Sequence, residues 1–155
     1  MEKTKILQQL KTAKTAHKNW VTKAKMLING FDIEADSIPM SADACEFGKW
    51  FHHEAKKLST ISSAPFECMK DINVYHTILH NTYENIYKIY YTNEKNSFFN
   101  KLFGIKKEVT QKERELSMRY FHEMEDISHR LIEELNKMEN RIMRMDATKL
   151  NTLSN

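Results

Sequence analysis

Apolar residues recur every three or four positions along the first 30 residues of the chain. This spacing predicts one amphipathic helix from Thr4 to about Ile28, with His17 on its inner face. Asn29 and Gly30 are expected to end this helix, because glycine accepts the left-handed conformation of a helix C-cap. The apolar positions of the predicted helix are Ile6, Leu10, Ala13, Ala16, Trp20, Ala24, Leu27 and Ile28.

Two further helical segments follow, each after a stretch of serine, proline and other turn-forming residues. Ser41 or Asp43 is expected to cap a short second helix that runs to about Leu58. A third helix is expected from about Pro65, which is tolerated in the first turn of a helix, to about Tyr91.

The last predicted helix, from Lys106 to about Asp146, is the longest and carries an apolar seam with steps of three and four residues. Such steps approximate the a and d positions of a heptad, so this helix requires a partner helix in the same chain or in another one. The seam consists of Leu116, Tyr120, Met124, Ile127, Leu131, Leu135, Met138, Ile142 and Met145.

The composition agrees with a few long helices. The chain has 155 residues but only three glycines and two prolines, which is too few for the many turns of a β-sandwich or barrel. We therefore expect an all-α fold, an antiparallel bundle of about four helices with a long C-terminal helix.

Charge and hydropathy indicate the cellular location of the protein and the classes of partner that it does not bind. The net charge of +3 does not by itself indicate a nucleic-acid partner. The first residues lack the apolar stretch of a signal peptide, and nowhere do 18 apolar residues follow one another. We expect a cytoplasmic protein that does not bind nucleic acid and does not insert into a membrane.

Histidine and cysteine supply the candidate chemistry. His76 and His80 on the third predicted helix lie about 40° apart around the axis and about 6 Å along it, so they can share one metal ion or simply stack at the surface. Cys45, near the start of the second helix, and His17, on the first, are further candidate ligands. Two cysteines are too few for a disulfide framework, which favours a reduced thiol or a metal site.

Five residues near these candidates suit the surroundings of a buried site. Gly48 falls one turn after the cysteine, where the missing side chain lets another helix approach closely. Trp20 and Trp50 offer large apolar side chains that either exclude water from a site or pack in an ordinary core. Glu84 and Asp43 are candidates to orient ligand histidines through hydrogen bonds.

The remaining histidines and the second cysteine are not expected to bind the metal. His52 lies about 10.5 Å along the helix axis from Cys45, which is too far for one ion to reach both. Cys68 is expected to be a small buried hydrophobic residue. The histidines expected to be solvated, or to lie behind the ligands, are His52, His53, His122 and His129.

Three short motifs follow one another between about residues 17 and 80: His17-Lys-Asn-Trp20, Cys45-Glu-Phe-Gly48-Lys-Trp50-Phe51 and His76-x-x-x-His80. Together they resemble the motif series of the bacterial chemoreceptor zinc-binding domain family. The resemblance implies a cytoplasmic helical bundle, often dimeric, that binds one zinc ion (Zn²⁺) through three histidines and one cysteine. Carried over to this chain, the ligands are His17, Cys45, His76 and His80.

The resemblance also divides the chain and indicates a function. Residues 1–95 would form the zinc-binding bundle, and residues 96–155 a connecting segment and an amphipathic helix that packs on the bundle or on a partner chain. In this family the domain usually accompanies a chemoreceptor signalling region or a nucleotide-cyclase output domain, and it senses zinc or hypochlorous acid through the ligand cysteine, here Cys45. We expect no output domain in this chain, because the segment after residue 95 is too short for one.

We therefore expect a homodimer that acts in bacterial signal transduction or chemotaxis through a partner, such as a chemoreceptor or another signalling protein. No enzymatic activity is expected, since four protein ligands leave a zinc ion no open position for water.

Two other functions remain open from the sequence. A hemerythrin-like di-iron protein that binds oxygen also uses helical histidines, with His122, Asp126 and Glu54 as candidate ligands, but it leaves the cysteine without a role. A helical interaction protein would work through its last helix alone.

Overall fold

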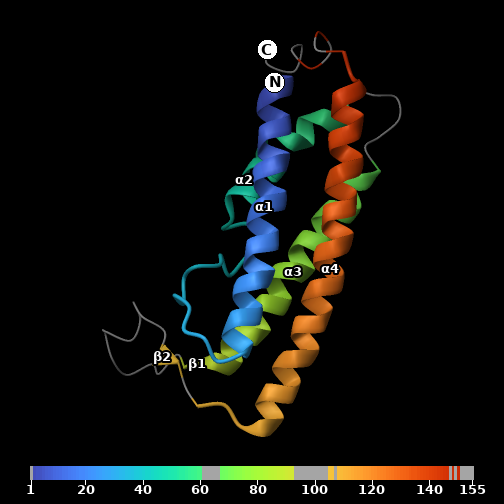
Figure 1. The fold of residues 1–155 in the computed structure, drawn as a ribbon. Coiled ribbons are helices and arrows are strands. Elements are labelled where there is room, and N and C mark those ends of the chain that lie inside the picture. The colour runs from blue at the N-terminus through green and yellow to red at the C-terminus, as the bar shows by residue number, and fades with distance from the viewer. Residues whose placement is uncertain are drawn as a thin grey trace.

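Four α-helices make up most of the regular structure in the described part of this computed structural model (Figure 1). The structure describes residues 2–60, 67–92, 105–106, 108–146, 148 and 150. The expected all-α bundle with a long C-terminal helix is confirmed, and none of the described helices has the length and apolar character needed to cross a membrane. In chain order the elements are α1 (Lys3–Ile28), α2 (Glu46–His53), the short 3-10 helix η1 (Ala55–Thr60), α3 (Cys68–Tyr90), β1 (Tyr91–Thr92), β2 (Ile105–Lys106) and α4 (Gln111–Arg144).

The three long helices lie side by side, and two lysines of α1 tie it to α4 (Figure 1). The Lys3 ammonium donates hydrogen bonds to the backbone carbonyls of Met143, at 2.7 Å, and Met145, at 2.9 Å. Further along α1, Lys14 forms an ion pair with Glu139 at 2.6 Å. The start of α1 therefore lies beside the end of α4, and the two helices run antiparallel.

The buried side of α4 faces α1 and α3 and repeats in alternating steps of four and three residues. Ser117 and Ser128 belong to it, whereas Leu116, Tyr120 and Ile127 of the predicted seam are only half-buried. The predicted seam contained only large apolar residues and therefore left out the two serines. A small residue in a helix interface is buried because it lets the helices approach closely. The alternating buried positions are Ser117, Phe121, Met124, Ser128, Leu131, Leu135, Met138 and Ile142.

The second helix is shorter than predicted and begins at a different cap. The N-cap of α2 is Cys45, whose Sγ accepts a hydrogen bond from the Gly48 backbone N–H at 3.1 Å. The predicted caps Ser41 and Asp43 were wrong, because the prediction considered only the usual oxygen-bearing capping residues. After α2 the chain continues as η1, and Pro65 lies outside the described residues.

The last helix begins at Gln111 rather than at Lys106. Thr110 Oγ1 accepts a hydrogen bond from the Glu113 backbone N–H at 3.3 Å, and the Glu113 carboxylate accepts one from the Thr110 N–H at 2.8 Å. This reciprocal capping box marks the true start of α4. Lys106 instead belongs to β2, where it pairs with Tyr91 of β1.

Candidate metal centre

One cluster of histidine and cysteine side chains lies in the interior, between α1, α3 and the start of α2. His17 comes from the middle of α1, Cys45 from the N-cap of α2, and His76 and His80 from successive turns of α3. One potential ligand atom from each residue lies within 4.8 Å of the others. None of the four residues is more than 1% exposed. Within the described ranges, no other group of three or more such side chains has this geometry.

Backbone carbonyls orient two of the histidine rings. His17 Nδ1 donates a hydrogen bond to the carbonyl of Ala13 at 2.6 Å, and His80 Nδ1 donates one to the carbonyl of Pro39 at 2.7 Å. A carbonyl can only accept, so each Nδ1 carries the proton and the Nε2 of each neutral ring keeps its lone pair. Both rings therefore present an electron-pair donor at Nε2.

The acidic residues predicted to orient these rings have other partners. Glu84 forms an ion pair with Lys88 at 2.7 Å. Asp43 lies 3.4 Å from His52 Nε2 on the outer side of α2. The orienting acceptors are main-chain carbonyls, which no side-chain pattern marks in the sequence.

Burial keeps the three histidines of the cluster neutral. Desolvation lowers the pKa of His17 to about 4, although its hydrogen bond to Ala13 acts in the opposite direction. Desolvation, with smaller contributions from the neighbouring histidines, lowers the pKa of His76 to about 2, and it also lowers the pKa of His80. Protons therefore do not compete with a metal ion for these rings at neutral pH.

Burial shifts the pKa of the cluster's thiol upwards, whereas it shifts the pKa of the histidines downwards. Desolvation raises the pKa of Cys45, although the Gly48 N–H at the start of α2 favours the thiolate. A cation bound at the sulfur would shift this balance, because a coordinating thiol is deprotonated.

The donor atoms of the cluster fit a bound cation. His17 Nε2 is buried and has no hydrogen-bond partner in the described part of the chain. His76 Nε2 lies 3.1 Å from Cys45 Sγ and 3.2 Å from His80 Nε2, so the remaining donors already converge. A metal ion held by the four side chains would satisfy the His17 nitrogen, whose desolvation otherwise costs about 1–3 kcal/mol.

Aromatic side chains wall the cluster. The half-buried Trp20 ring lies 4.4 Å from the His17 ring and 5.3 Å from the His80 ring. Phe47, which lies in the cysteine motif but was not predicted to contact the site, has its ring 5.6 Å from the His17 ring. Trp50 is buried against Phe47 at 5.8 Å and so lies one layer further out.

Gly48 lies where any side chain would collide. A Cβ on Gly48 would stand 1.9 Å from the carbonyl oxygen of Ala42 and 3.2 Å from Cε1 of His76. The missing side chain thus admits both the imidazole of α3 and the backbone of the preceding loop. A close approach was predicted at Gly48 from the sequence, but only by another helix.

The other candidates lie outside the cluster. Cys68 is half-buried at the start of α3. The carboxylates considered for a di-iron site, Glu54 and Asp126, are exposed, and the cluster itself contains no carboxylate. The exposed histidines outside the cluster are His52, His53, His122 and His129.

Comparison with known proteins assigns this region to a family. Residues 17–87 match the family model described as the chemoreceptor zinc-binding domain, and this segment includes all four members of the cluster. No curated protein and no solved structure matches the chain. The segment that carries the buried histidine and cysteine cluster therefore matches the chemoreceptor zinc-binding domain family.

Proposed function

We propose that the protein is a zinc-binding regulatory protein in which His17, Cys45, His76 and His80 hold one Zn²⁺. The observation that carries the proposal is the convergence of four buried donor atoms within 4.8 Å in a zinc-binding domain. Zinc favours nitrogen and sulfur ligands in a tetrahedral set, and four protein ligands leave no position for a catalytic water. The site therefore serves regulation rather than catalysis.

Cys45 is the residue through which the site responds to oxidant. A bound zinc ion would supply the positive charge that keeps this buried sulfur a thiolate, which is its reactive form. With hypochlorous acid, the thiolate sulfur forms a bond to oxygen and gives up two electrons. The oxygen–chlorine bond breaks, chlorine leaves as chloride, and the proton stays on the oxygen of the sulfenic acid.

The position of Cys45 gives this reaction a structural consequence. It is the only member of the cluster that lies at α2, and its sulfur also accepts the Gly48 N–H that begins this helix. Oxidation would weaken both the attachment of the sulfur to the histidines of α1 and α3 and the start of α2. Loss of zinc at low zinc concentration would release the same attachment.

The proposed setting is bacterial signal transduction, including chemotaxis. The protein would act in the cytoplasm as a homodimer, and the movement of α2 would be read by α4 or by a docked chemoreceptor or other signalling protein. The family match supports this setting, because the domain is described as a chemoreceptor module.

A hypochlorite titration of the zinc-loaded protein tests the redox part of the proposal. The wild type should release zinc to a chromogenic indicator, and dimedone labelling with mass spectrometry should find the sulfenic acid on Cys45. Cys68→Ser is the matched control and should behave like the wild type. Release that persists unchanged in Cys45→Ser, or labelling confined to Cys68, would overturn the role of Cys45. Two iron atoms per chain and a visible absorption band would instead support the di-iron function.

A further inference from the structure

The loop between α1 and α2 depends on other elements for its path. Residues 29–45, all of them within the described part of the chain, form no helix or strand. The Ser37 N–H donates a hydrogen bond to the Glu34 carbonyl at 3.0 Å, which closes one turn inside the loop. The Ala44 N–H and the Ser41 carbonyl close another at 3.1 Å. Local turns do not determine the route of a loop over the long helices, so contacts to those helices must fix it.

Side chains of α1 and α3 hold the centre of the loop. The Lys23 ammonium of α1 donates a hydrogen bond to the Ser37 carbonyl at 3.2 Å. His80 Nδ1 of α3 donates one to the Pro39 carbonyl at 2.7 Å. Ile38, which lies between the two carbonyls in the sequence, is buried. Lys23 lies outside the metal cluster, whereas His80 belongs to it. The centre of the loop is therefore attached directly to a candidate zinc ligand.

The two ring nitrogens of His80 connect the loop to the interior of the cluster. Nδ1 is the donor to Pro39, and Nε2 lies 3.2 Å from Nε2 of His76. Coordination at Nε2 would fix the plane of the ring and draw electron density from it, so that the Nδ1–H becomes a stronger donor. The loop would then be held more firmly when the site is filled. By thermodynamic linkage, a loop held in place raises the affinity of the site for the cation by the same factor.

The attachment at Cys45 is separate from this one. Cys45 lies at the end of the loop and caps α2, where its Sγ accepts the Gly48 N–H. Pro39 lies in the middle of the loop and is bound by His80. The centre of the loop and α2 are thus attached to the cluster through different ligands.

We infer that the centre of the loop, residues 31–41, is a second zinc-dependent segment, coupled to the metal site through the hydrogen bond from His80 to Pro39. The inference rests on the proposed zinc site. It adds an element whose order follows zinc occupancy even without the sulfur ligand, because three histidines can hold a zinc ion. The exposed side chains of Glu34 and Asp36 lie on this segment, so the surface offered to a partner changes with zinc.

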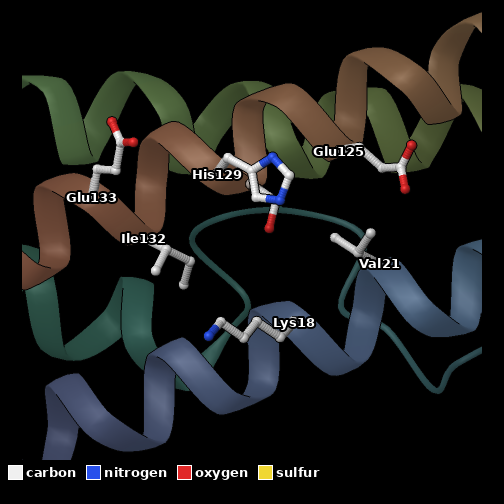
Figure 2. Close-up of a pocket in the computed structure, with 7 residues that line it drawn as sticks. Lys18, Val21, Glu125, His129, Ile132 and Glu133 are labelled. Carbon is white, nitrogen blue, oxygen red and sulfur yellow. The ribbon is translucent and has the colours of Figure 1, made fainter.

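Hydrogen exchange with mass spectrometry on the zinc-loaded and zinc-free full chain tests the inference. Amides of residues 31–41 should exchange about tenfold more slowly with zinc. The reference is α4, which contributes no residue to the cluster and lines an open groove towards α1 with Glu125, His129 and Glu133 (Figure 2). Exchange in α4 should stay the same. An equal change in α4 would show that zinc stabilises the whole fold rather than the loop, and would overturn the inference.

Zinc-loaded Cys45→Ser separates the two attachments. Residues 31–41 should keep their slow exchange in this variant, whereas residues 46–53 of α2 should lose protection. Loss of the zinc-dependent protection of residues 31–41, or its absence in the wild type, would contradict the coupling through His80.

Lys23→Gln tests the coupling in the reverse direction without touching the cluster. It removes the contact to the Ser37 carbonyl and should weaken zinc binding about threefold in competition with a chromogenic chelator. Lys25→Gln, which removes the same charge from an exposed position of α1, should bind zinc like the wild type. Loss of a positive charge alone would favour a cation, so the expected weakening is opposite to the electrostatic effect. Equal affinity of the two variants would refute the coupling.

Zinc content measured on the same samples distinguishes this inference from the proposed function. A wild-type chain that holds one zinc ion but shows no change in the loop refutes the coupling alone. A chain that takes up no zinc refutes the proposed function, and the coupling with it.

Discussion

Main-chain carbonyls decide which nitrogen of the His17 and His80 rings faces the candidate metal centre. His17 is held by the Ala13 carbonyl one turn earlier on its own helix, whereas His80 is held by the Pro39 carbonyl in the loop before α2. The orientation of His80 therefore depends on the path of that loop. The same loop contributes the Ala42 carbonyl that crowds Gly48. Loop and ligands are thus one structural unit.

Gly48→Ala should destabilise the protein because the new Cβ meets backbone rather than a flexible side chain. The predicted contact is 1.9 Å to the Ala42 carbonyl oxygen. Alanine gains helix propensity over glycine, but overpacking outweighs this gain, so we expect a net loss of about 2 kcal/mol in the free energy of unfolding. Urea denaturation measures it, with Lys49→Ala on the exposed side of α2 as the control. Equal stability of the two variants would refute the close packing.

Two buried tyrosines should respond oppositely to loss of their hydroxyl groups. The Tyr83 hydroxyl is buried without a hydrogen-bond partner in the described residues, whereas the Tyr90 hydroxyl bonds to Ser117 Oγ at 3.1 Å. Tyr83→Phe should therefore raise the free energy of unfolding by about 1 kcal/mol and Tyr90→Phe should lower it by a similar amount. Urea denaturation of both variants is the measurement. A loss of stability in Tyr83→Phe would mean that this hydroxyl has a partner.

The sequence revealed the residues of the cluster but not what positions them. The spacing of His76 and His80 on one helix can be recognised from the 3.6-residue repeat alone. The motif series brought in His17 and Cys45. The carbonyls of Ala13 and Pro39 could not be predicted, because every residue carries a carbonyl and only the folded path selects one.

At the scale of elements, α2 depends on few contacts of its own. It has eight residues, and its first turn is capped by the same sulfur that belongs to the cluster. Isolated helices of this length are marginal in water, so tertiary contacts must hold it. Phe47 and Phe51 supply part of them by burying their rings against each other, 5.4 Å apart. A change at Cys45 should therefore destabilise the whole of α2.

The capping box of α4 can be tested directly. Thr110→Ala removes the acceptor for the Glu113 N–H and should lower the free energy of unfolding by about 1 kcal/mol. Thr22→Ala, on the exposed side of α1, is the matched control and should stay within about 0.5 kcal/mol of the wild type. Thermal or urea unfolding compares the two variants. If both were equally stable, the capping box would contribute nothing to α4.

Helix positions proved easier to predict than helix faces. The first helix was expected from Thr4 to about Ile28 and runs over Lys3–Ile28, because its apolar spacing is regular and glycine follows it. The buried face of α4 was displaced by one residue at three positions, Phe121 and the two serines Ser117 and Ser128. Hydrophobicity cannot identify a small polar residue that is buried only because two helices come close together.

At the scale of the molecule, the candidate metal centre joins α2 and its preceding loop to the long helices. α4 packs along α1 and α3, whereas the loop and α2 are held to those helices around the cluster. The long helices thus form a frame, and α2 is the part whose attachment depends on the cluster. This division is what would let a change at one sulfur alter part of the fold without unfolding the rest.

The stability of the molecule should fall at alkaline pH. Burial raises the pKa of Tyr91 to about 12 and raises that of Tyr83 as well. Unfolded tyrosine titrates near 10, so above pH of about 10 the unfolded state loses protons that the folded state keeps. The contribution is fully present below pH of about 10 and is lost as the pH rises towards 12. Urea denaturation across this range should show a steeper loss for the wild type than for the variant with Tyr83→Phe and Tyr91→Phe. Equal pH dependence would contradict the shifts.

X-ray absorption at the zinc K-edge of the zinc-loaded protein tests the central proposal most directly. We predict one sulfur neighbour at about 2.3 Å and three nitrogen neighbours at about 2.0–2.1 Å. In Cys45→Ser the sulfur neighbour should disappear, and in Cys68→Ser it should remain. A zinc environment with no sulfur, with two sulfurs, or with a sulfur that survives in Cys45→Ser would contradict the assignment of His17, Cys45, His76 and His80 as the ligands.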